Sequence, residues 1–187
     1  ADAVLAARST VSVGLPQFGA THNETRPDGR FTTWLGQLQW VRRLPYDTQL
    51  VARADSQIAA DPLLPTEKFP IGGATSVRGY RESQIVRDSG SVASVELRIP
   101  VGRVPIPGLS AESEGRLEIA PFVDSGWAWN KGQATTRLTS YGAGFRWRPT
   151  RALALELYKG FATKHVDQPG NTLQDRGVHF VVAYRYD

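Results

Sequence analysis

Apolar and polar residues alternate with a period of two along nearly every segment that lies between turn signals in this sequence. Because successive side chains of a β-strand point to opposite faces, this period predicts strands with one apolar and one polar face. The pattern predicts an all-β, antiparallel fold of about eight strands, each roughly 10–13 residues long. The alternating segments are 3–15, 31–43, 49–60, 91–101, 115–129, 138–148, 153–158 and 178–186.

Strands of this length can cross a bilayer when they are tilted, and the loop lengths indicate the same architecture. Outer-membrane barrels join their strands by short periplasmic turns and by longer outer loops. In this sequence, short turns at 44–47 and 149–151 alternate with long connections at 16–30, 61–90 and 162–176. The connection at 102–114 is an exception to this alternation, because it is long on the side that we assign to the periplasm.

The aromatic residues of the apolar face favour a membrane over the dry core of a soluble β-sandwich, which also alternates. Assigning the short turns to one rim places aromatic side chains near both rims, as at the two interfaces of a bilayer. The polar face carries Arg, Glu, Gln and Gly, which suit a water-filled lumen. We therefore expect a transmembrane β-barrel with aromatics near one rim (Trp40, Trp147, Tyr184, Tyr186) and near the other (Trp34, Trp127, Trp129, Tyr141).

The longest predicted loop, at about 61–90, is rich in glycine and contains the box Val-Arg-Gly-Tyr at 77–80. Its glycines permit backbone angles that other residues avoid, so the segment is able to fold back sharply. The arginine offers a planar fork of donors, which needs a carboxylate partner when it is held inside a structure. The alternative is a surface loop with an incidental arginine. The loop residues that we single out are Gly72, Gly73, Val77, Arg78, Gly79 and Tyr80.

Five carboxylates of the polar face are candidate partners for Arg78 if the loop enters the lumen. Asp124 is favoured because Ser125 and Gly126, which follow it, leave room for an incoming loop. An ion pair of Asp124 with a lumen arginine such as Arg146 is the alternative. We expect an Arg78–Asp124 latch with Gly126 and Glu118 beside it on the wall; the five carboxylates are Asp55, Glu96, Glu118, Asp124 and Glu156.

The sequence gives no support to catalysis, metal binding or nucleic-acid binding. The net charge is only +4, without a run of Lys and Arg. The three histidines are scattered, and no nucleophile elbow, metal-ligand spacing or phosphate loop occurs. We therefore expect a protein that is not an enzyme and that needs no cofactor. No apolar run approaches the length of a transmembrane helix, whereas alternating barrel strands remain compatible with a membrane.

The stretch 69–80, Phe-Pro-Ile-Gly-Gly-Ala-Thr-Ser-Val-Arg-Gly-Tyr, resembles the lid-loop motif of the outer-membrane superfamily that includes the BamA insertases. Blocks at 54–69, 88–90, 96–100 and 120–126 resemble its two-partner secretion transporters, the TpsB proteins of the haemolysin-activator type (ShlB, HecB and FhaC). The resemblance implies an integral outer-membrane translocator that exports a large haemolysin- or adhesin-type exoprotein (TpsA) without ATP. It also implies that the loop enters the barrel from outside and that Arg78 pairs with Asp124 on the inner wall.

Members of that family have a barrel of about sixteen strands, preceded by POTRA domains and a plug helix, so the resemblance covers the C-terminal half of a barrel. We expect residues 1–187 to form one partial barrel domain with an inserted lumenal lid. Three alternatives are open: a fragment of a full transporter, a half barrel that pairs with another copy or chain, and a truncated small barrel closed on itself. A closed barrel of eight strands would be too narrow to pass a polypeptide with the lid inside it. The expected partners are the exoprotein, outer-membrane lipid, the barrel assembly machinery, and the missing N-terminal barrel half with its POTRA domains or a second copy.

The last strand resembles the family's assembly signal, in which alternating apolar residues end in an aromatic. That signal falls on Phe180, Val182, Tyr184 and Tyr186, and the following Asp187 departs from the family pattern. Two other functions stay open: an outer-membrane insertase or assembly factor of the same superfamily, and a passive structural barrel. A loop buried in the lumen favours a transporter or an insertase, whereas an exposed loop favours the passive barrel.

Overall fold

The computed structural model describes residues 2–15, 27, 29–111, 114–164, 166 and 172–185. One antiparallel sheet of eight strands dominates the fold, as the alternation predicts, and each strand pairs with its neighbour. The all-β, antiparallel prediction is therefore confirmed. In spatial order the strands are β1 (Ala3–Val13), β2 (Thr32–Arg43), β3 (Gln49–Ala59), β6 (Ser89–Arg103), β7 (Arg116–Trp129), β8 (Thr136–Arg148), β9 (Leu153–Ala162) and β10 (Val178–Tyr184).

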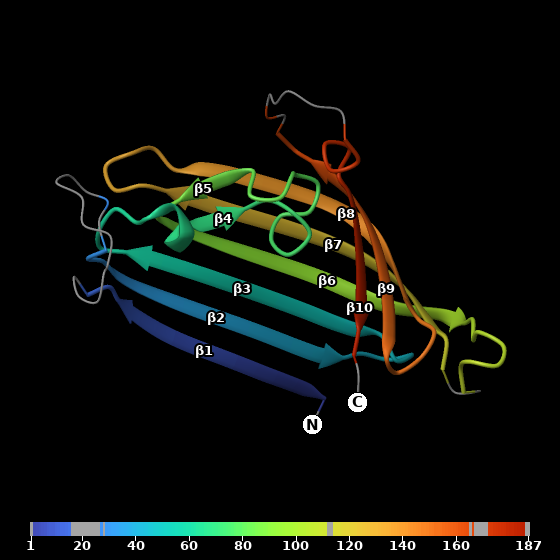
Figure 1. The fold of residues 1–187 in the computed structure, drawn as a ribbon. Helices are drawn as coiled ribbons and strands as arrows, with labels where there is room; N and C mark the ends of the chain where they lie inside the picture. The colour runs from blue at the N-terminus through green and yellow to red at the C-terminus, as the bar shows by residue number, and fades with distance from the viewer. Residues whose placement is uncertain are drawn as a thin grey trace.

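The sheet curls strongly but stays open, with β1 and β10 at its two edges (Figure 1). A small barrel closed on itself is one of the alternatives that the sequence leaves open, and the described residues do not form one. Backbone N–H and C=O groups along an open edge would have no water to bind in a bilayer, where both edges would need a partner strand. No helix within the described ranges is long and apolar enough to cross a membrane.

Residues 60–88 connect β3 to β6 and lie against the concave face of the sheet (Figure 1). They contain a 3-10 turn, η1 (Pro65–Glu67), and a short hairpin of β4 (Phe69–Ile71) and β5 (Ile85–Arg87). The alternation did not predict β4 and β5, because three residues are too few to establish a period. We call residues 60–88 the lid segment.

Alternation also fixes which side chains lie on each face of the sheet. On β7, Phe122 and Asp124 are buried on the concave face, whereas Val123 is 55% exposed on the convex face. None of the five tryptophans is buried, which excludes the dry sandwich core. An apolar face that stays exposed is suited to lipid. Large apolar side chains exposed on the convex face include Val95, Tyr141, Phe145, Leu157, Phe161 and Phe180.

Candidate functional site

The lid segment packs its apolar side chains onto the concave face of the wall. Ile71 and Val77 are fully buried, and the Tyr80 side chain is nearly so. Gly72 and Gly73, which follow β4, have φ angles of 107° and 105°, a region that disfavours other residues. The wall contributes the remaining members of this apolar cluster, among them Val92, Ala128 and Leu138.

Arg78 reaches from the lid to the wall and is 2% exposed. Its Nε and Nη2 each donate to one oxygen of Asp124 over 2.9 Å, the bidentate geometry that suits a guanidinium. The backbone N–H of Arg78 donates to Asp124 Oδ2 over 3.0 Å, and the Ser94 hydroxyl donates to Oδ1 over 2.6 Å. Both oxygens of this fully buried carboxylate therefore have donors.

Glu96 is a second carboxylate partner of Arg78. Its Oε2 accepts from Nη1, while Nη2 donates to Ser94 Oγ over 3.0 Å. Its Oε1 accepts from Arg98 Nε over 2.8 Å, so two arginines balance the two carboxylates. Alternation places Glu96 among the lumen carboxylates but does not single it out as a partner of Arg78. The reason is register: the wall pairs Ser94 with Asp124, and alternation alone does not fix which residues stand opposite one another.

Two aromatic rings complete the socket around the arginine. The Arg78 Cζ lies 3.6 Å from the centre of the Phe122 ring and 4.8 Å from that of Tyr158. The two rings meet edge to face, with centres 5.9 Å apart. A desolvated guanidinium gains electrostatic attraction from ring faces at these distances. We call Arg78 and its five neighbours, Ser94, Glu96, Phe122, Asp124 and Tyr158, the arginine socket.

The charge state of Arg78 follows from its surroundings. Burial alone would lower the pKa of the guanidinium, but the hydrogen bonds and negative charges of Asp124 and Glu96 raise that pKa above its ordinary value. Arg78 is therefore a permanent cation, and its docking does not depend on proton uptake.

Glycines of the wall let the lid backbone approach closely. A Cβ added to Gly160 of β9 would lie 2.5 Å from the backbone N of Gly79 and 2.7 Å from the carbonyl carbon of Arg78. A Cβ on Gly126 would lie 2.8 Å from Val77 Cγ2. Gly79 itself has a φ of 103°. The sequence indicates Gly126 and Gly79 but not Gly160, because the importance of Gly160 depends on the backbone that lies over it.

The loop between β9 and β10 adds a second attachment for the lid. Arg81 Nε lies 2.6 Å from Asp175 Oδ1. The Tyr80 hydroxyl donates to Thr139 O over 3.1 Å and accepts from Lys164 N over 3.2 Å. Hydrogen bonds from the Thr172 backbone and hydroxyl, together with the Arg81 charge, hold the pKa of Asp175 below its ordinary value.

Glu118, expected beside the latch, does not contact Arg78. Its Oε1 accepts from Arg116 Nε over 2.7 Å, and its Oε2 lies 3.8 Å from Arg146 Nη1. Arg146 binds Glu156 over 2.5 Å instead of taking Asp124, so the alternative pairing considered from the sequence does not form.

The residues of the expected assembly signal lie on β10. Phe180, Val182 and Tyr184 are 65%, 53% and 69% exposed on the convex face, as alternation requires. Tyr186 lies outside the described residues. Recognition by an assembly machinery stays a prediction.

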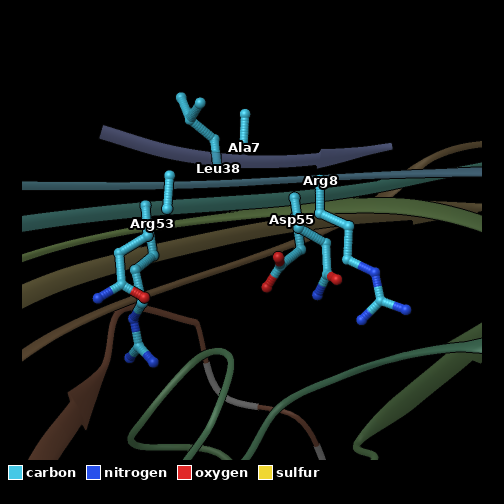
Figure 2. A pocket seen from close by; sticks show the side chains of 8 residues that line it. Ala7, Arg8, Leu38, Arg53 and Asp55 are labelled. Carbon is cyan, nitrogen blue, oxygen red and sulfur yellow. The ribbon is translucent and has the colours of Figure 1, made fainter. Parts of the chain in front are cut away.

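The concave face of β1–β3 is charged and largely uncovered. Figure 2 shows Arg8, Arg53 and Asp55 pointing to one side of the sheet, while Ala7 and Leu38 point to the other. Arg8, Arg53 and Asp55 line a groove of about 320 Å³ together with Gln37 and Gln39. Arg8 and Arg53 are exposed, and neither forms an ion pair with any residue that the structure describes.

Comparison with known families gives a match that covers most of the chain. The family described as haemolysin secretion/activation protein ShlB/FhaC/HecB matches residues 1–147, which include the lid segment and most of the arginine socket. No curated protein matches the chain.

Proposed function

The chain belongs to the haemolysin secretion/activation family ShlB/FhaC/HecB, and we propose that its lid segment is the gate of the translocation path. Proteins of this family are outer-membrane transporters of two-partner secretion, so the protein is an integral outer-membrane transporter. The family implies an exoprotein of the TpsA type as its cargo. In our proposal, the arginine socket latches the lid closed and the arriving cargo displaces it.

One observation carries this proposal: the bidentate Arg78–Asp124 contact joins a loop to the inner wall in a fully buried setting. Removing one partner of a buried ion pair leaves an uncompensated charge and costs about 3–5 kcal/mol. A latch of that strength keeps the resting path closed. Cargo opens it only by making compensating contacts with the lid, the wall or both.

The expectation of a partial barrel also remains part of the proposal. The two edges, β1 and β10, need strands beside them in lipid. An eight-stranded wall closed on itself would be filled by side chains, without room for a polypeptide beside the lid. We propose that further strands, from the rest of a larger barrel or from a second copy, complete the wall. Edge strands of the cargo are then able to pair with exposed backbone along the path.

A reversible covalent bond between lid and wall tests the gate. The sequence contains no cysteine, so an engineered pair is unambiguous. Val77→Cys on the lid and Gly126→Cys on β7 are suitable, because a Cβ on Gly126 would lie 2.8 Å from Val77 Cγ2. We expect the oxidised pair to block exoprotein secretion and a reductant to restore it. Each single cysteine is the control, and normal secretion by the fully oxidised pair would contradict the proposal.

The open strand edges also favour the insertase alternative, in which a weak seam accepts strands of other outer-membrane proteins. The two functions differ in the number of proteins that depend on them. Deleting a transporter removes its exoprotein from the medium, whereas deleting an insertase lowers the level of many outer-membrane proteins. Quantitative mass spectrometry of the outer membrane and the medium separates them.

A further inference from the structure

The convex face of β7, β8 and β9 changes character toward the rim from which the lid enters. Val123, Tyr141 and Phe161 form one row across the three strands, and the rings of Tyr141 and Phe161 stack with centres 5.6 Å apart. This row is exposed and apolar. It marks the upper end of the surface that lipid chains cover.

The next row toward the rim carries hydroxyl groups. Ser125 pairs with Thr139, and their side-chain oxygens lie 3.2 Å apart. Thr163 continues the row, with its backbone N–H and its hydroxyl both donating to Thr139 O. Neutral hydroxyls at this height suit the boundary between acyl chains and headgroups, where polar groups are no longer costly.

Cations lie one step beyond the hydroxyl row. Arg137 pairs across the strands with Trp127, and its Cζ lies 5.3 Å from the centre of the Trp127 ring. Lys164 follows Thr163, and both cations are exposed. Neither has a carboxylate partner in the described part of the chain.

A cleft joins these groups at the rim of the wall. It has a volume of about 470 Å³ and is lined by Arg137, Lys164 and four threonines, Thr135, Thr136, Thr139 and Thr163. A neighbouring cleft of about 460 Å³ shares Thr135 and is lined by Trp127 and Trp129. Tryptophan rings favour the interface between headgroups and acyl chains.

We propose that this cleft binds the phosphorylated headgroup of an outer-leaflet glycolipid. The wall presents apolar rings, then hydroxyls, then cations in order toward the rim. This order matches the acyl chains, the sugar and the phosphate of such a lipid. Arg137 presents the planar fork that recognises phosphate, and Lys164 supplies a second positive charge. The threonine hydroxyls are able to bind sugar hydroxyls between them.

This inference rests on the outer-membrane location of the family and on the outward direction of the long loops. It does not depend on movement of the lid, so failure of the gate experiment would leave it standing. The test uses the protein purified in detergent micelles, with intact lipopolysaccharide, dephosphorylated lipopolysaccharide and inorganic phosphate as probes. Native mass spectrometry measures the bound lipid, and the difference in tryptophan fluorescence between the wild type and a Trp127→Phe variant gives an independent reading.

We expect intact lipopolysaccharide to bind saturably, and the Arg137→Ala/Lys164→Ala variant to bind it roughly five- to tenfold more weakly. Arg137→Lys keeps the charge and should retain part of the affinity. Arg42→Ala is the matched control, because Arg42 is an exposed cation on the convex face at the opposite rim. Its affinity should equal that of the wild type.

Dephosphorylated lipopolysaccharide should bind the wild type about as weakly as intact lipid binds the double variant. Equal affinity for the intact and dephosphorylated lipids would overturn the proposal, as would an unaffected double variant. Saturation by inorganic phosphate at the same concentrations would also overturn it, because the site would then belong to a free anion. Heat-shifted mobility on electrophoresis establishes that each variant is folded.

Discussion

Two regions of the same concave face differ in what covers them. Under the lid, the wall from β6 to β9 has buried charges that are joined by hydrogen bonds, and Arg78 and Asp124 are 2% and 0% exposed. On β1–β3 the wall has charges of the same kinds, Arg8, Arg53 and Asp55, on an uncovered face (Figure 2). Alternation produces both regions in the same way. The lid alone makes one a closed socket and leaves the other open to solvent.

The largest effect should come from removing the lid arginine. Arg78→Ala leaves Asp124 and Glu96 without their shared cation, and we expect the docked lid to lose about 3–5 kcal/mol. The covered region would then resemble the open one. Limited proteolysis of residues 60–88 should become fast while the barrel still assembles. Exoprotein secretion should fall sharply, because an undocked lid stays in the passage without the fixed position from which cargo displaces it. Protease resistance and secretion at the wild-type level would count against the latch.

Exchanging the charges sharpens this prediction. Arg78→Asp with Asp124→Arg restores the pair but places an aspartate against Glu96, which binds the Arg78 Nη1 in the wild type. Like charges at that distance repel, so we expect little rescue. Adding Glu96→Gln to the exchange should improve both lid protection and secretion. A full rescue without that third change would mean that Glu96 is not an essential part of the socket.

A methyl group on the wall should have the next largest effect. Gly160→Ala places a Cβ against lid backbone, which cannot rotate away as a side chain can. Overpacking of this kind typically costs about 1–3 kcal/mol, which should appear as faster proteolysis of the lid. Gly102→Ala is the matched control, because a Cβ there meets nothing within 4 Å. Equal protection in the two variants would show that the lid does not rest on β9.

Acidification should weaken the Arg81–Asp175 contact that attaches the lid to the loop between β9 and β10, with a smaller effect on lid protection than Gly160→Ala. The pKa of Asp175 is lower in the folded protein than in the unfolded chain, so its carboxylate stabilises the folded state at neutral pH. That contribution is lost as the pH falls through the lowered pKa. Hydrogen exchange of residues 78–81 should accelerate over this acidic range in the wild type. Asp175→Asn should start from weaker protection and lack this part of the pH dependence.

The smallest effect is expected on the uncovered region. Arg53→Ala removes an exposed cation that forms no ion pair with a described residue, so stability should change by less than about 0.5 kcal/mol. Protease protection of the lid should also be unchanged. If Arg53→Ala loosened the lid as strongly as Gly160→Ala, the two regions would not be independent. Urea unfolding and lid proteolysis measure the two quantities separately.

Much of this arrangement could be predicted from the sequence, because the period of two assigns each strand residue to a face. It placed Asp124 and Glu96 inside and Val123 and Tyr141 outside without any knowledge of neighbours. What it could not supply was the register between strands, and therefore the fact that Glu96, Phe122 and Asp124 adjoin one another. The role of Gly160 was hidden for a related reason, since only the docked lid backbone makes its missing side chain matter. The gating role of the lid remains a prediction.

The charge balance of the socket has an electrical consequence. With the lid docked, Arg78 and Arg98 neutralise Asp124 and Glu96. If the lid withdraws as we propose, Arg78 leaves with it, and Asp124 loses its cation while Arg98 stays on Glu96. The proposed opening would thus change the polarity of the channel lining as well as its width, and an arginine of an incoming chain would be able to bind the carboxylates that Arg78 leaves.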